Sequence, residues 1–147
     1  MKSRTLSATA MILLTPLVVL AFQAQAEQIR NRELKNKSFT VGSLKITFIK
    51  PISFDGISVE VENTSDDYTT FNPRLLSFID KDNNQIDILG ARMRFEVGME
   101  FGRSVVKAED TRIAPKARIK RSYALTDYME LPARLYYEDK LLATVIN

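Results

Sequence analysis

The sequence contains no cysteine and no histidine among its 147 residues. The absence of cysteine excludes thiol catalysis and disulfide bonds, so packing alone must stabilise the fold. The absence of histidine removes the commonest general base, the commonest transition-metal ligand and the side chain that titrates near neutral pH. Because only Asp, Glu, Lys, Tyr and Ser are left for such chemistry, we expect a protein that is not an enzyme and that carries no cofactor.

The first 26 residues have the parts of a secretory signal peptide in the usual order. Lys2 and Arg4 provide positive charge, residues 8–22 form a nearly continuous apolar run, and Ala24-Gln25-Ala26 offers small side chains to signal peptidase. The apolar run is shorter than the roughly 20 residues that a membrane-spanning helix needs, and it contains a proline. We therefore expect cleavage after Ala26 and export to the periplasm or the medium, with no transmembrane segment afterwards.

Removal of this segment changes the charge of the chain. The full sequence has 21 basic and 18 acidic residues. Since Lys2 and Arg4 leave with the signal peptide, 19 basic residues stand against 18 acidic ones, which gives a net charge of +1. A nearly neutral exported protein gives no reason to expect a nucleic-acid partner.

Beyond Phe39, apolar residues recur at every second position, the spacing that puts alternate side chains on one face of a β-strand. The Asp and Asn residues at 80–84 predict a hairpin turn, and the glycines at 98 and 102 predict an irregular connection. We expect strands over residues 44–48, 57–61, 74–80, 85–89, 91–97, 117–125, 135–137 and 141–146.

Short strands separated by turns are typical of an antiparallel β-sandwich. The predicted organisation is a signal peptide over residues 1–26, a polar N-terminal tail over 27–37 and one all-β domain over 38–147. We expect about seven strands in that domain, arranged as an immunoglobulin-like sandwich.

Four stretches of the sequence resemble a family of immunoglobulin-like domains on bacterial exported proteins, typified by a small secreted mycobacterial immunogenic protein. They are Val59–Ser65, Phe78–Asp80 before the Asp/Asn turn, Ile113–Lys116, and Leu131–Tyr137. The family commonly has glycine in the turn where this chain has Asn83-Asn84, and glycine after the equivalent of Pro115, where this chain has Lys116. The resemblance implies a sandwich over Phe39 to Asn147 and a binding or structural role, and it transfers no catalytic residue.

The hairpin turn also carries oxygen ligands at spacings similar to those of a calcium loop. The residues are Asp80, Asp82, Asn84 and Asp87. Gln85 stands where such a loop needs glycine, and Ala91 stands where it needs a closing glutamate. A polar turn explains the same residues, so we predict no metal site and keep these four as weak candidates.

The most basic segment of the chain precedes Leu125. If its alternate residues lie outward on one strand, they present a row of donors to phosphate or carboxylate groups. The other interpretation is a solvated strand face that acidic residues balance elsewhere. The candidates for contact with an anion are Arg112, Lys116, Arg118, Lys120 and Arg121.

Tyrosines are crowded into the last third of the sequence, and tyrosine suits interfaces because its ring is large and amphipathic. Tyr136 and Tyr137 are adjacent, so they face opposite sides of any strand and at most one of them lies in the core. The outward one of this pair is a candidate for a partner contact.

We therefore expect a non-catalytic, exported binding or interaction module of the bacterial cell envelope, whose partner is another envelope protein or an anionic envelope polymer. The alternative is an anion-binding protein that uses the strand from Arg112 to Arg121 to contact envelope lipid or polysaccharide. A third possibility is a carboxylate-based hydrolase, because Glu60 and Glu62 share one face of a predicted strand.

Overall fold

A computed structural model describes the backbone of residues 26–54, 56–97 and 100–147, with the side chains of residues 93–103 left aside. The expected signal peptide, apart from Ala26, lies outside the described residues. Within them the chain forms twelve strands and two short 3-10 helices, so the prediction of an all-β protein is confirmed. None of the helices in this part of the chain has the length and apolarity to span a membrane.

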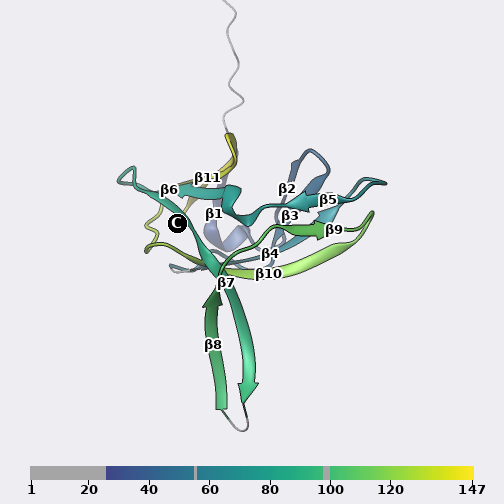
Figure 1. The fold of residues 1–147 in the computed structure, drawn as a ribbon. Helices are drawn as coiled ribbons and strands as arrows, with labels where there is room; N and C mark the ends of the chain where they lie inside the picture. The colour runs from purple at the N-terminus through teal and green to yellow at the C-terminus, as the bar shows by residue number, and fades with distance from the viewer. Residues whose placement is uncertain (1–25, 55, 98–99) are drawn as a thin grey trace, which may run out of the picture.

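The strands form one large curled sheet and one small sheet (Figure 1). The large sheet has ten strands in the order β1-β12-β11-β6-β7-β10-β4-β3-β2, with β8 attached to β7, and the small sheet pairs β5 with β9. The strands are β1 Gln28–Arg30, β2 Ser38–Val41, β3 Leu44–Phe48, β4 Gly56–Asn63, β5 Thr69–Phe71, β6 Leu76–Ile79, β7 Gln85–Val97, β8 Glu100–Val106, β9 Thr111–Ile113, β10 Arg118–Leu125, β11 Ala133–Tyr137 and β12 Lys140–Ile146. The helices are η1 Asn31–Glu33 and η2 Pro73–Leu75.

This arrangement has more strands than the seven or so antiparallel ones that we expected, and its large sheet contains both parallel and antiparallel pairs. The pairing of β1 with β12 is parallel, while the other neighbours in the large sheet run antiparallel. The curl brings apolar residues from both halves of the sheet into a single core. The alternating residues of β3 and β4 face this core, and Ile46, Phe48, Val59 and Val61 are fully buried there, as their spacing predicts.

The long strand β7 connects the two halves of the sheet. Its first residues pair with β6, its middle pairs with β10, and residues 91–97 pair with β8. The sequence predicts two separate strands here, but the backbone continues through Leu89 and Gly90. Ala124 pairs with Gly90 while Leu125 pairs with Ile88, so Leu89 is the extra residue of a β-bulge.

Beyond Ala91, β7 and β8 form a two-stranded hairpin that projects from the body (Figure 1). The irregular connection that we expected around the glycines is wrong for Gly102, which lies inside β8 and pairs with Phe95 of β7, and Gly98 lies outside the described residues. Glycine is only weakly unfavourable in a strand, so it interrupts the sequence pattern without ending the pairing.

Residues 27–37 are not the free polar tail that we expected. β1 pairs with β12, and Ile29 and Leu34 are 4% and 0% exposed. The Asn31 side chain holds Ile52 at both polar backbone atoms: Nδ2 donates to the carbonyl and Oδ1 accepts from the N–H, each over 2.8 Å. Two apolar anchors and one amide thus attach a mostly polar segment to the domain.

Asn63, at the end of β4, is fully buried and ties two loops together. Its Nδ2 donates to the carbonyls of Asp67, Ile113 and Ala114 over 2.6, 3.1 and 3.2 Å. Its Oδ1 accepts from the Ser65 N–H over 3.0 Å and from the Ser65 hydroxyl over 2.7 Å. This side chain therefore fixes the loop after β4 against the turn that precedes β10.

Candidate functional site

Exposed apolar side chains gather where the β7–β8 hairpin leaves the body. Phe54, Leu89, Val105 and Tyr128 are 63%, 58%, 50% and 67% exposed. We refer to these four residues as the apolar patch. Single exposed apolar residues are ordinary, but several together mark an interaction surface.

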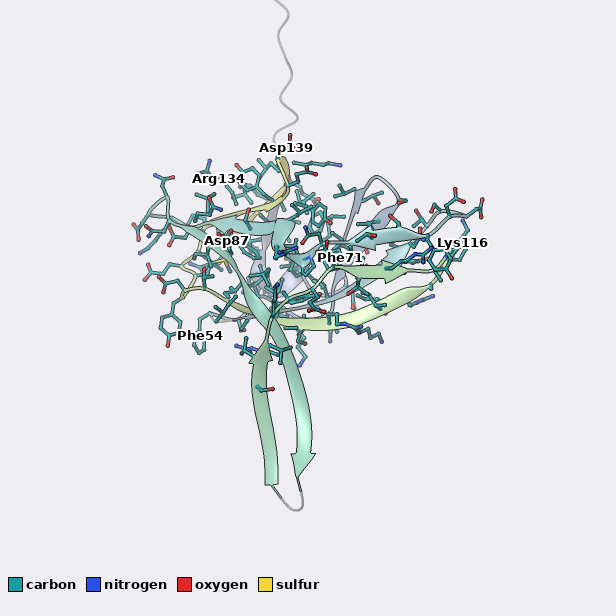
Figure 2. All side chains as sticks on the ribbon, viewed as in Figure 1. Phe54, Phe71, Asp87, Lys116, Arg134 and Asp139 are labelled. Carbon is teal, nitrogen blue, oxygen red and sulfur yellow. The ribbon has the colours of Figure 1, made fainter. Side chains whose placement is uncertain are left out.

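Two loops supply the aromatic members of the patch. Phe54 lies in the turn before β4, where the Ser53 N–H and hydroxyl donate to the Gly56 carbonyl over 3.0 and 2.9 Å. The Phe54 carbonyl accepts from the Met129 N–H over 3.1 Å, which joins this turn to the loop after β10. The rings of Phe54 and Tyr128 consequently lie with centroids 5.4 Å apart and planes at 40°. Figure 2 shows Phe54 pointing away from the body.

The aliphatic members come from β7 and β8. Ile86 and Ile88 are buried and face the core, and Gly90 is buried as well. Leu89 lies between Ile88 and Gly90 at the outward position of this alternation, so its side chain points to solvent. Val105 comes from β8 and lies beside Gly90, the residue after Leu89, since a Cβ built on Gly90 would lie 2.7 Å from Val105 Cγ1.

Gly56 makes room for Arg92. A Cβ on Gly56 would lie 3.0 Å from Arg92 Cζ and 2.8 Å from the Tyr123 carbonyl oxygen. Arg92 therefore extends from β7 across β10 to the backbone of β4. A larger residue at position 56 would displace the guanidinium.

Beside Arg92 the surface is hollowed into a concavity of about 380 Å³. It is lined by Leu89, Arg92, Ala124, Leu125, Thr126, Asp127 and Tyr128. The Thr126 hydroxyl accepts from the Asp87 N–H over 3.0 Å, and Asp127 Oδ1 accepts from the Tyr128 N–H over 2.7 Å. These bonds order the polar side of the concavity. Its size lies at the small end of the roughly 300–1,000 Å³ that ligand pockets occupy.

The basic residues that we predicted as an anion site are largely engaged by protein groups. Arg118 and Lys120 flank one carboxylate, that of Glu60, at 3.5 and 3.6 Å. Lys116 Nζ donates to the Thr64 carbonyl over 2.6 Å and lies 3.6 Å from Asp66. The row is thus part of a solvated face on which acidic residues alternate with basic ones.

The other two members of the row, Arg112 and Arg121, lie apart from that carboxylate. The Arg112 guanidinium lies 3.9 Å from the centroid of the Tyr68 ring, and Arg121 Nη1 donates to the Lys120 carbonyl over 2.9 Å. In Figure 2, Lys116 and Phe54 lie on opposite sides of the molecule, so this end of the row is far from the aromatic part of the apolar patch.

Of the two adjacent tyrosines, Tyr137 is the one in the core. It is 4% exposed, its ring stacks on Phe71 with centroids 6.0 Å apart, and its hydroxyl accepts from the Asn72 N–H over 3.3 Å. Burial raises the pKa of Tyr137. Tyr137 is therefore wrong as a partner contact, because no partner reaches it. Tyr136, on the other face of β11, is half-buried.

The four weak calcium candidates do not form a common site. Asp80 is 7% exposed, and its Oδ1 accepts from the N–H groups of Asp82 and Asn84, each over 2.9 Å. The backbone donor at Asn84 is the main reason why the pKa of Asp80 is lowered. Asp87 lies in β7 and accepts from Gln85 over 3.0 Å. Asp80 thus stabilises its own turn, and the described residues contain no group of three or more acidic residues that could hold a metal ion.

The sequence interpretation missed the apolar patch. Leu89 has the character of a core residue, and Phe54 and Tyr128 are far apart in the chain. The available signal was an aromatic residue inside a polar turn, since Phe54 precedes Asp55-Gly56 and Tyr128 follows Thr126-Asp127.

In comparisons with protein-family models, curated proteins and solved structures, the chain matches none.

Proposed function

We propose that this protein is a non-catalytic, exported binding module of the bacterial cell envelope, which holds another envelope component at the apolar patch. The single observation behind the proposal is the patch itself, in which four side chains are at least half exposed and two of them, Leu89 and Tyr128, line a concavity. Phenylalanine, tyrosine, leucine and arginine in one place have the composition of an interface centre more than that of a solvated surface.

The charge distribution supports this surface over the basic row. Glu60 lies between Arg118 and Lys120, so an anionic ligand would have to compete with a fixed carboxylate for both cations. Exposed ion pairs are also screened at physiological ionic strength. The row is therefore the second candidate, as a contact for anionic lipid or polysaccharide.

The export signal and the immunoglobulin-like resemblance belong to the same proposal. A surface that offers an apolar patch and one carboxylate in its concavity suits the binding role of a bacterial exported domain. N-terminal sequencing of the exported protein should begin at Glu27, and a start at Met1 would contradict export with cleavage.

The binding proposal is tested by capture from envelope extract at low and high salt. The Leu89→Ser and Tyr128→Ala proteins should lose what the wild-type protein captures, and raised salt should leave that capture intact. Tyr68→Ala is the matched control, because Tyr68 is 57% exposed but lies on the loop before β5, away from the patch. Capture that the patch variants retain, and that salt or Lys120→Ala abolishes, would instead favour the anion-binding alternative.

A further inference from the structure

We infer that the concavity beside the apolar patch binds an uncharged sugar ring, so that the envelope component is a neutral glycan or carries one. This inference rests on the proposed function and names the chemistry of its ligand. It is carried by three features of the site: an aromatic platform, a polar edge and the absence of net charge.

The aromatic platform is formed by Phe54 and Tyr128. Phe54 and Tyr128 are about two thirds exposed although their rings are in contact. Each ring therefore keeps a face open to a ligand. An aromatic face carries partial negative charge, whereas the C–H groups on the flat side of a pyranose ring carry partial positive charge. A sugar can therefore stack here without needing a deep, dry pocket.

The polar edge lies next to the platform on the same loop. Asp127 Oδ1 is used by the Tyr128 N–H, which fixes the carboxylate, and Oδ2 accepts no hydrogen bond from the described residues. The Thr126 hydroxyl accepts from Asp87 and keeps its own proton to donate. A sugar needs this combination, because its hydroxyl groups both donate and accept around the rim of an apolar ring face.

The charge of the concavity argues for an uncharged sugar. Among the described residues that line it there is one cation, Arg92, and one anion, Asp127, whose formal charges cancel. An acidic polymer would place its carboxylates beside Asp127, which is unfavourable. The concavity thus differs in its ligand from the basic row on β10.

The test is titration of the isotopically labelled exported protein with maltohexaose, cellohexaose and chitohexaose, followed by amide chemical shifts. At least one of these neutral oligosaccharides should produce saturable shifts that centre on Gly56, Leu89 and residues 126–128. Tyr128→Ala should weaken that binding by about tenfold, because it removes one stacking ring. Tyr128→Phe keeps the ring and should bind within about threefold of the wild-type protein, and Tyr68→Ala should bind equally well.

The other outcomes separate this inference from the proposed function. If no neutral oligosaccharide gives saturable shifts up to about 10 mM, or if oligogalacturonate binds in their place, the sugar inference is wrong. If envelope capture still depends on Leu89 and Tyr128 in that case, the binding module stands with a ligand of another class, such as an apolar peptide. If capture is independent of the patch, the proposed function itself fails.

Discussion

Replacing Asn63 with alanine should lower the free energy of unfolding by about 2 to 5 kcal/mol. The substitution removes three donated and two accepted hydrogen bonds. The bond to the Ile113 carbonyl is fully buried, so this acceptor loses its partner where water cannot replace it, which costs about 1 to 3 kcal/mol. The remaining bonds are partly buried, and water recovers much of their energy, so together they add about 1 to 2 kcal/mol.

Urea unfolding followed by far-UV circular dichroism measures this difference, provided that the slope against denaturant is unchanged. Ser65→Ala is the matched control, because it removes one partner of the amide and leaves the three carbonyl contacts in place; it should cost about 1 kcal/mol. If Asn63→Ala were no more destabilising than Ser65→Ala, the amide would not hold the two loops together, and the account of this region would be refuted.

Four further predictions concern the strands, the patch and two perturbed side chains. Gly90→Val should destabilise the protein by at least about 1 to 3 kcal/mol in urea unfolding, because a side chain there overlaps the Val106 carbonyl and Val105. Leu89→Ser should change stability by less than about 0.5 kcal/mol while abolishing capture, whereas Ile88→Ser at the neighbouring buried position should cost about 3 kcal/mol or more. Burial raises the pKa of Tyr123 to about 12. The contribution of the protonated phenol to the free energy of unfolding is therefore complete below the ordinary pKa of 10.0, and this free energy should fall as the pH rises from 10.0 toward 12, as unfolding curves at alkaline pH would measure. The pKa of Asp80 is lowered, so the effect of pH has the opposite direction. The ionised carboxylate contributes to the free energy of unfolding above the ordinary pKa of 3.8, and this contribution is lost as the pH falls below that value. Asp80→Ala should therefore make the free energy of unfolding depend less on pH in the acid range.

Alternation of apolar residues predicts most of the strands because one face of the sheet packs against the core and the other face meets water. Leu44, Ile46 and Phe48 face the core, while Lys45 and Thr47 between them face outward, and β3 has the bounds that this pattern indicates. The pattern fails for β1, where Ile29 is the only buried residue of three. A strand that short depends on its partner β12 and on the Asn31 contacts with Ile52, which are tertiary and leave no periodic signal.

Two turns have a left-handed backbone conformation at residues other than glycine. Asn83 and Lys116 have φ angles of 63° and 58°, the left-handed region that glycine favours. Asparagine tolerates this conformation well, whereas a lysine side chain is disfavoured there, and in this protein the Lys116 ammonium is held by the Thr64 carbonyl.

The apolar patch escapes prediction because its members come together only in the folded protein. Leu89 takes the outward position that alternation with Ile86 and Ile88 gives it, but this alternation does not show which other residues lie beside it. Phe54 meets Tyr128 because the Met129 N–H binds the Phe54 carbonyl. Leu89 is 58% exposed, so a large apolar side chain meets water at this point. Its position beside two exposed aromatic rings and an ordered carboxylate is consistent with selection for contact with a ligand, and for this reason the capture and stability measurements on Leu89→Ser must be made on the same protein.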